Sequence, residues 1–214
     1  MKRLFSAVLL IIVVLPVMYC SKSSSVPDDP AASLKGTVWA GQFHYLHGYT
    51  EQQPFSVKLD ADSSFTWYQL GPHQSGRWWV KDSIISLRFP QEDVLLEANF
   101  KADVWNNFVY PGQKRWLIDK LYRSRMLNAD SLRGSIWLGK LRGGISFGLA
   151  FLPGTQLKCH IDPAVAHYAV EGAGIQFPIK SGQSFAVIEK DGFSMTGIYL
   201  DPPSVYYLWY VNKQ

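Results

Sequence analysis

The stretch SLKGTVWAG at residues 33–41 is repeated as SLRGSIWLG at residues 131–139. Five of the nine positions are identical, including one tryptophan and two glycines in each copy, and three of the other four are conservative changes. The copies begin 98 residues apart, well beyond the ~20–50 residues that separate repeats in solenoids and propellers. This domain-sized spacing predicts two tandem copies of one ancestral unit.

Within each copy, apolar residues recur with a period of two. They occupy every second position in FSVKL (55–59) and in IQFPI (175–179), a pattern that indicates strands with one buried face. Turn-forming sequences, such as residues 60–64 and 152–154, separate the strands. No stretch favours an amphipathic helix, and residues 123–131 are expected to form a linker with at most one helical turn. We therefore predict an all-β fold of two antiparallel up-and-down sheets, each a small barrel or barrel-like unit.

The first copy resembles a known family of small β domains. The opening LKGTVWAG (34–41), the turn LDADSSFTW (59–67) and the stretch SGRWWVKDSIISLRF (75–89) are similar to the lipocalin-like domains common among bacterial lipoproteins. The resemblance implies strands that run up and down and curl into a barrel, with repeats at residues 33–126 and 127–214. Those domains begin with a Gly-x-Trp strand, whereas both copies here have Gly-x-x-Trp. This departure leaves open whether each tryptophan takes the family's position at the barrel end.

The N-terminus has the layout of an export signal. Lys2 and Arg3 precede an apolar run from Leu4 to Met18, which stops just before Cys20. The run has about 15 residues, fewer than the roughly 20 that span a bilayer as a helix, and a basic start before a short apolar run is typical of a secretory signal. A cysteine at this boundary resembles the signal of bacterial lipoproteins. The resemblance predicts a signal segment over residues 1–20 and lipid attachment at Cys20.

The residues around Cys20 also bear on location. Tyr19 is bulky where the lipoprotein pattern has a small residue, so a plain secretory signal and an uncleaved membrane anchor remain alternatives. Residues 21–32 are rich in serine, proline and aspartate and are expected to form a disordered tether. Ser21 lacks the acidic retention signal, which implies the outer membrane of a Gram-negative cell envelope. The expected partner is thus the membrane, contacted through a lipid anchor.

The charge balance argues against nucleic acid as a partner. Without Lys2 and Arg3, the 21 basic residues fall to 19, against 17 acidic residues, whereas nucleic-acid binding needs a clustered basic face. One basic cluster exists, and we expect a solvated hairpin and linker there, with contact to anionic lipid headgroups as the alternative. Its members are Lys114, Arg115, Lys120, Arg123 and Arg125.

The two cysteines predict a protein without a disulfide. If Cys20 carries lipid, Cys159 has no partner in the chain, and LKCHI (157–161) places it on the apolar side of an alternating stretch. A small buried thiol is the expected role. In an oxidising compartment a hydrophobic core must then hold the fold, and 47% hydrophobic residues supply the material.

One motif resembles a catalytic one but predicts a strand. GISFG (144–148) matches the Gly-x-Ser-x-Gly turn of serine hydrolases. That chemistry needs the serine on a sharp strand-to-helix turn, whereas Ser146 lies in an alternating apolar stretch with no helix after it. We therefore predict no catalytic residues and no enzyme activity. Phosphate-cradling glycine loops are also absent from the sequence, so no cofactor is expected.

No residue pattern predicts a metal site. Residues 60–64 begin like a calcium loop, but Gly71 stands at the twelfth position, where a carboxylate is needed. Cys159 faces away from His160 and Asp162 on a strand, which leaves two ligands, too few for structural zinc. We expect the histidines at the surface: His44, His47, His73, His160 and His167.

The aromatic residues are the remaining candidates for a binding site. Small barrels fill with their own side chains, so core packing is the expected role of the tryptophans, and a groove between the copies is the better place for a ligand. Fold analogy then suggests a non-catalytic binding module for a small apolar or envelope-derived ligand. The alternative is a structural or interaction component of an outer-membrane protein assembly. The tryptophans are Trp39, Trp67, Trp78, Trp79, Trp105, Trp116, Trp137 and Trp209.

Overall fold

The computed structural model describes residues 29–46, 51–112, 116–202 and 205–214. The predicted signal segment, Cys20 and most of the predicted tether lie outside these residues. Among the residues described, no helix is both long enough and apolar enough to cross a membrane.

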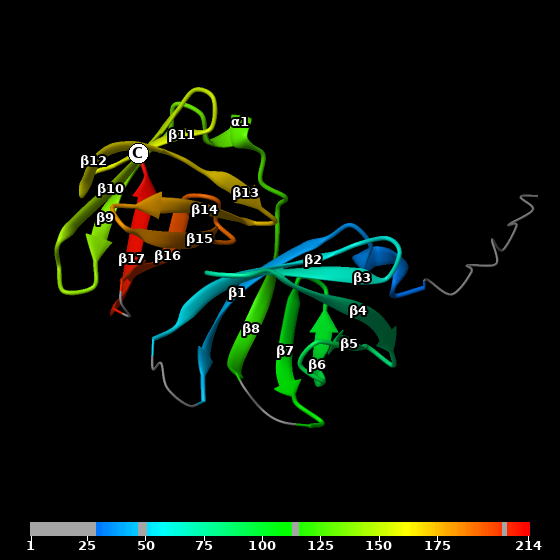
Figure 1. Ribbon diagram of the computed structural model, residues 1–214. Helices are drawn as coiled ribbons and strands as arrows, with labels where there is room; N and C mark the ends of the chain where they lie inside the picture. The colour runs from blue at the N-terminus through cyan, green and yellow to red at the C-terminus, as the bar shows by residue number, and fades with distance from the viewer. Residues whose placement is uncertain (1–28, 47–50, 113–115, 203–204) are drawn as a thin grey trace, which may run out of the picture.

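The first unit is a closed barrel of eight antiparallel strands that follow one another in sequence order (Figure 1). A single 3-10 turn, η1 (Ala32–Leu34), precedes the barrel. The strands are β1 (Val38–Tyr45), β2 (Gln53–Leu59), β3 (Ser64–Tyr68), β4 (Gln74–Lys81), β5 (Ile84–Phe89), β6 (Val94–Lys101), β7 (Val104–Val109) and β8 (Trp116–Ser124). Pairing of β1 with both β2 and β8 closes the barrel.

The second unit is a nearly closed antiparallel sheet of nine strands. A single helical turn, α1 (Ala129–Leu132), precedes it. The strands are β9 (Ile136–Leu141), β10 (Ser146–Leu152), β11 (Gln156–Cys159), β12 (Asp162–His167), β13 (Ala169–Glu171), β14 (Gly174–Ile179), β15 (Gly182–Ile188), β16 (Ser194–Asp201) and β17 (Val205–Lys213). Their order in the sheet is β12-β11-β10-β9-β17-β16-β15-β14-β13. The predicted all-β fold of two barrel-like units is confirmed, and the two sheets are separate rather than fused.

One stretch of chain supplies both edges of the second sheet. Tyr168 alone separates β12, which pairs with β11, from β13, which pairs with β14. The carboxylate of Asp162, at the start of β12, accepts a hydrogen bond from the backbone N–H of Lys180 in the β14–β15 turn. This bond links the two edges, because the ladder itself does not continue between them.

The expected linker over residues 123–131 is shorter than predicted. Arg123 and Ser124 belong to β8, where both pair with β1. Asn128 then caps α1, since its side-chain oxygen accepts a hydrogen bond from the N–H of Asp130 at 2.9 Å. The helix α1 is the single helical turn that the sequence allowed in this region, whereas the prediction missed the last two residues of β8.

The first copy of the repeated sequence forms a turn that anchors a tryptophan. Gly36 has a φ of 73°, in the left-handed region that glycine adopts at little cost. The Oγ1 of Thr37 donates to the carbonyl of Leu34 at 2.6 Å and accepts from the Nε1 of Trp39 at 2.8 Å. The indole is thus fully buried with its one polar group satisfied.

The second copy forms the same turn. Gly134 also has a φ of 73°. The Oγ of Ser135 donates to the carbonyl of Leu132 at 2.5 Å and accepts from the Nε1 of Trp137 at 2.9 Å. The repeated sequence therefore specifies one structural motif, a turn whose hydroxyl accepts a hydrogen bond from the tryptophan. Serine and threonine are interchangeable in it because each supplies a hydroxyl.

Both interiors are filled with side chains. In the barrel, the ring of Trp67 stacks on that of Phe55 with centroids 4.0 Å apart and on that of Trp116 at 5.4 Å. In the second unit, Trp209 contacts Phe147 at 4.8 Å. Seven of the eight tryptophans are buried, and Trp79 is 43% exposed. Core packing, the expected role, is confirmed for those seven.

Replacement of the buried hydroxyl tests the role of the repeated turn. Thr37→Val keeps the side-chain shape but leaves the Trp39 N–H buried without an acceptor, which costs about 1–3 kcal/mol. We expect the free energy of unfolding from denaturant titration to fall by that amount. Ser131→Ala removes an exposed hydroxyl that bonds to Asn128 and should change it by less than about 0.5 kcal/mol. Equal effects of the two changes would contradict the role assigned to Thr37.

Candidate functional site

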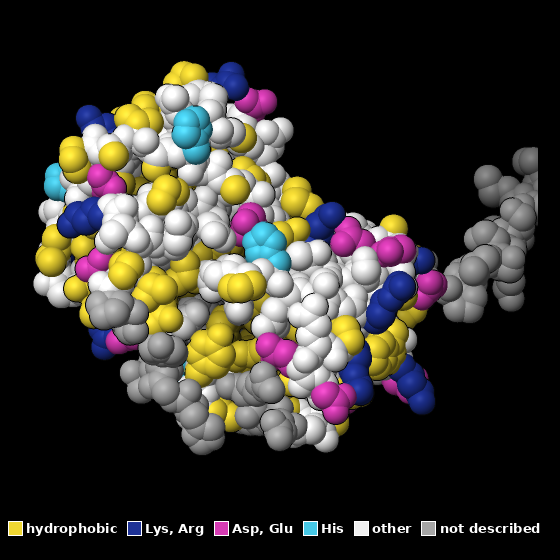
Figure 2. All heavy atoms as spheres, in the orientation of Figure 1, with side chains coloured by type: hydrophobic (Ala, Val, Ile, Leu, Met, Phe, Trp, Pro, Cys, Tyr) yellow, Lys and Arg dark blue, Asp and Glu magenta, His cyan; other side chains and the backbone are white. Residues whose placement is uncertain are grey.

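The two units meet on the outer face of β2. Alternation along β2 predicts that Ser56 points into solvent, yet Ser56 is fully buried. The second unit covers it: β15 and β16 both contact β2. Figure 2 shows the two units as two lobes, with hydrophobic side chains in the hollow where they meet. The buried apolar residues of this joint are Val38, Ala40, Ala173, Phe185 and Val187, with Tyr68 and Leu70 packed against them.

Hydrogen bonds fix the position of the joint. The Oγ of Ser56 donates to the carbonyl of Glu171 and accepts from the N–H of Ala173, both at 3.2 Å. Gly172 lies between these partners with a φ of 65°, and a Cβ on it would stand 2.5 Å from the Ser56 hydroxyl. This close approach therefore requires glycine.

Among the residues that the structure describes, two contacts between basic and acidic side chains also connect the units. The Nε2 of His73 lies 2.9 Å from the Oε1 of Glu171, whose side chain is only 12% exposed. Burial raises the pKa of the Glu171 carboxyl, although neighbouring His73 acts in the opposite direction. The second pair joins Arg142 to Glu51. The joint thus combines an apolar centre with charged contacts around it.

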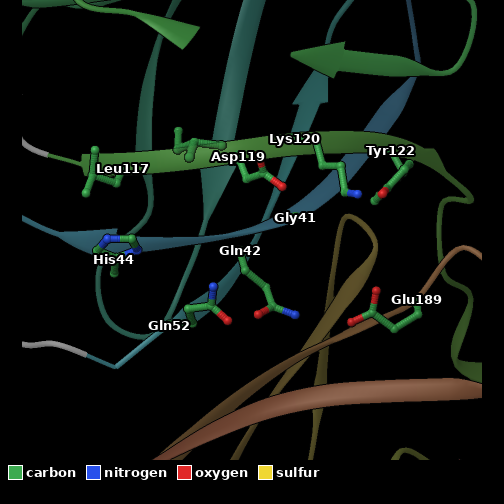
Figure 3. Close-up of a pocket in the computed structure, with 10 residues that line it drawn as sticks. Gly41, Gln42, His44, Gln52, Leu117, Asp119, Lys120, Tyr122 and Glu189 are labelled. Carbon is green, nitrogen blue, oxygen red and sulfur yellow. The ribbon is translucent and has the colours of Figure 1, made fainter. Parts of the chain in front are cut away.

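A first cleft opens beside the joint, on the outer face of the barrel (Figure 3). It has a volume of about 340 Å³, and its floor is formed by β1 and β8. Gln42 and His44 come from β1, Asp119 comes from β8, and Glu189 reaches in from the second unit. Its amide, carboxylate and imidazole groups can bond to a ligand, and Leu117 and Ile118 add apolar surface.

Tyr122 is the aromatic wall of this first cleft. The Nζ of Lys120 lies 5.3 Å from the centre of its ring, and the Nζ of Lys190 lies 5.8 Å from it. Both distances suit a cation–π contact, and Lys190 belongs to the second unit. The hydroxyl of Tyr122, through a hydrogen bond, raises the pKa of Lys120. Charged groups from both units therefore converge on one ring.

A second, larger cleft of about 700 Å³ adjoins the first, and Glu189 lines both. Its walls come from the segment after β8, from the β15–β16 turn and from the end of β17. The basic side chains in it are Arg123, Arg125, Lys190 and Lys213, and the acidic ones are Asp103, Glu189 and Asp191. Met126 and Phe193 are apolar and are 48% and 66% exposed. This size lies within the range of ligand sites in proteins.

Few of the candidate site residues from the sequence lie close together in the structure. Cys159 is buried, as expected, and burial raises the pKa of its thiol to about 11. Ser146 is exposed and is the first residue of β10, with no helix after it. Among the residues described, no three His, Cys, Asp or Glu side chains are placed to hold a metal ion. Of the histidines, His44 lines the first cleft and His73 lies at the joint, while His47 lies outside the described residues.

The expected basic cluster is divided by the fold. Lys120 lines the first cleft, whereas Arg123 and Arg125 line the second. Lys114 and Arg115 lie outside the described residues. Sequence reasoning missed Gln42, Gln52 and Glu189 as cleft residues, because polar residues on the outer face of a strand or in a turn look like ordinary solvent-exposed positions.

A pair of glycine variants tests the joint. Gly172→Ala and Gly154→Ala both place a side chain at a positive φ, but only the first brings it against other atoms, the Ser56 hydroxyl at 2.5 Å and the Tyr68 ring at 3.0 Å. We expect Gly172→Ala to loosen the joint, seen as faster proteolysis between the units and a larger radius of gyration in solution scattering. Gly154→Ala, whose Cβ meets nothing within 4 Å, should leave both unchanged. Equal behaviour of the two variants would contradict the requirement for glycine at position 172.

The pKa of Glu171 gives a second test of the joint. Because burial raises its folded pKa above the ordinary 4.5, the folded state is most stable below pH 4.5 with respect to this group and loses stability as the pH rises through the folded pKa. Glu171→Gln removes this titration and keeps an acceptor for His73. We expect the melting temperature of the variant to change less than that of the parent between pH 4.5 and 7. Asp93→Asn, at a side chain that is 86% exposed, should retain the parent's dependence, and an unaltered profile in Glu171→Gln would count against a buried carboxyl.

No protein-family model, curated protein or solved structure matches the chain. The joint and its two clefts are therefore the features from which a function is inferred.

Proposed function

We propose that the protein is a lipid-anchored, non-catalytic binding module of a bacterial cell envelope, and that its ligand lies in the clefts between the two units. One observation carries the proposal: both interiors are filled, whereas concave surface is present at the junction of the units. The ligand would be small and in part apolar, because apolar and polar side chains line the same walls. The anchor would be attached at Cys20, and the outer membrane is the proposed location.

One surface feature favours the alternative, a component of an outer-membrane protein assembly. Ile136, Leu138 and Val165 are each about half exposed on the second unit. Ile136 and Val165 share a row across the sheet, through Ala150 and Lys158. Exposed apolar patches of this kind mark interaction surfaces. The binding role is preferred because the clefts are concave and receive polar groups from both units.

Native mass spectrometry of the full-length protein, extracted gently from membranes of its own host, tests the proposal. We expect a reproducible bound mass that is lost on denaturation. Glu189→Trp places a large side chain on the wall shared by both clefts and should abolish the bound mass. Glu97→Trp makes the same change on β6, away from both clefts, and should retain it.

The other outcomes of this measurement are equally informative. Bare parent protein, or equal retention in both variants, would contradict a ligand in the clefts. A co-purifying partner chain with no small bound mass would favour the assembly role. The mass of the protein itself tests the anchor, because lipid attachment predicts loss of residues 1–19 and the addition of acyl groups at Cys20.

A further inference from the structure

We infer that the second cleft binds a single-chain anionic amphiphile, with a carboxylate or phosphate head and an alkyl tail, outside both barrels. This inference rests on the proposed function, because it names the ligand class of the same junction. It is carried by two features of the second cleft, its unpaired cations and its exposed apolar side chains. Together they match one chemistry, an anionic head group joined to an apolar tail.

Three cations in the cleft have no carboxylate partner. Among the residues described, no acidic oxygen lies within 4.0 Å of Arg125, Lys190 or Lys213. They come from three different elements: the segment after β8, the β15–β16 turn and the end of β17. A carboxylate or phosphate head group in the cleft could pair with these cations.

Two of the three acidic groups of the cleft are engaged elsewhere and are not paired with these cations. Asp103 is engaged with Arg123, at 3.7 Å. Asp191 accepts three hydrogen bonds within its own turn: from the backbone N–H of Phe193 and of Ser194, at 2.8 Å each, and from the Ser194 hydroxyl at 2.6 Å. These bonds lower the pKa of Asp191, so it stays charged and bound to the turn. Glu189 directly precedes Lys190 in the chain and lines both clefts.

The apolar side of the cleft can accept a tail. Phe193 is 66% exposed although it is a large aromatic residue in a short turn. Its carbonyl accepts a hydrogen bond from the N–H of Lys213 at 2.8 Å, which places the ring and this cation on neighbouring backbone. Met126, Leu127 and Ile188 add apolar surface on the other walls. Burial of these side chains under an alkyl chain would gain about 25 cal/mol per Å².

Photolabelling in membranes that contain the full-length protein tests this inference. The probe is a ten-carbon carboxylate with a diazirine on its chain, compared with the same chain carrying a trimethylammonium or a glucoside head. We expect the carboxylate probe to label peptides containing residues 123–128 and 188–193 about tenfold more than the other two, a difference of about 1.4 kcal/mol. Excess decanoate or decyl phosphate should compete with the labelling.

Matched variants separate the head from the tail. The double change Arg125→Glu with Lys190→Glu should reduce carboxylate labelling about tenfold, whereas Lys81→Glu with Lys101→Glu, outside the clefts, should not. Phe193→Ser should weaken labelling by all three probes, and Trp79→Ser, at an exposed aromatic outside the clefts, should not.

The inference is overturned if labelling is equal for the three head groups, occurs on other peptides, or persists in the variant Arg125→Glu with Lys190→Glu. Failure of this inference can be distinguished from failure of the proposed function. A bound mass in native spectrometry without carboxylate labelling rejects the amphiphile and leaves the binding role. If neither is seen, both are rejected.

Discussion

The contact that buries Ser56 holds together the two units whose side chains form both clefts described above. This contact buries the outer face of β2, which would otherwise be exposed to solvent. It also holds the second unit against β1 and β2 of the barrel. The hydroxyl of Ser56 can reach the Glu171 carbonyl and the Ala173 N–H because Gly172 has no side chain. If this small polar contact were lost, the walls of both clefts would separate, since each is built from both units.

Because both interiors are filled with side chains, the region between the two units is the proposed place for a ligand. A barrel whose aromatic rings stack on one another at 4.0 Å and 5.4 Å gains stability from that packing, and a ligand could enter only by displacing these rings. The repeated turn contributes to this stability in both units, because it satisfies the indole N–H of Trp39 and of Trp137. The two interiors therefore serve as scaffolds, and the functional surface is the region between them. Gene duplication of one stable unit would create such a region without any change to the core.

The sequence predicted the fold well and the site poorly, for physical reasons. A nine-residue repeat and a period of two specify two antiparallel β units, and seven tryptophans pack as expected. Burial of Ser56 could not be predicted, because alternation within one strand says nothing about what covers its outer face. Nor could the approach of Lys190 to the ring of Tyr122, because these two residues are 68 positions apart in the chain and meet only through the joint. The turn η1 was missed because a single 3-10 turn has no apolar periodicity to reveal it.

Amide hydrogen exchange at Ala173 measures the central contact most directly, because the acceptor of its N–H is a side chain of the other unit. If the joint is rigid, this amide in the parent protein is protected from exchange as strongly as the interior amides of β14 and β15. Ser56→Ala should then remove the protection of Ala173, while the amides of β14 and β15 keep theirs. Exchange of Ala173 in the parent at the rate of an exposed loop would mean that the units move independently, and it would contradict the account of a binding site shared between them.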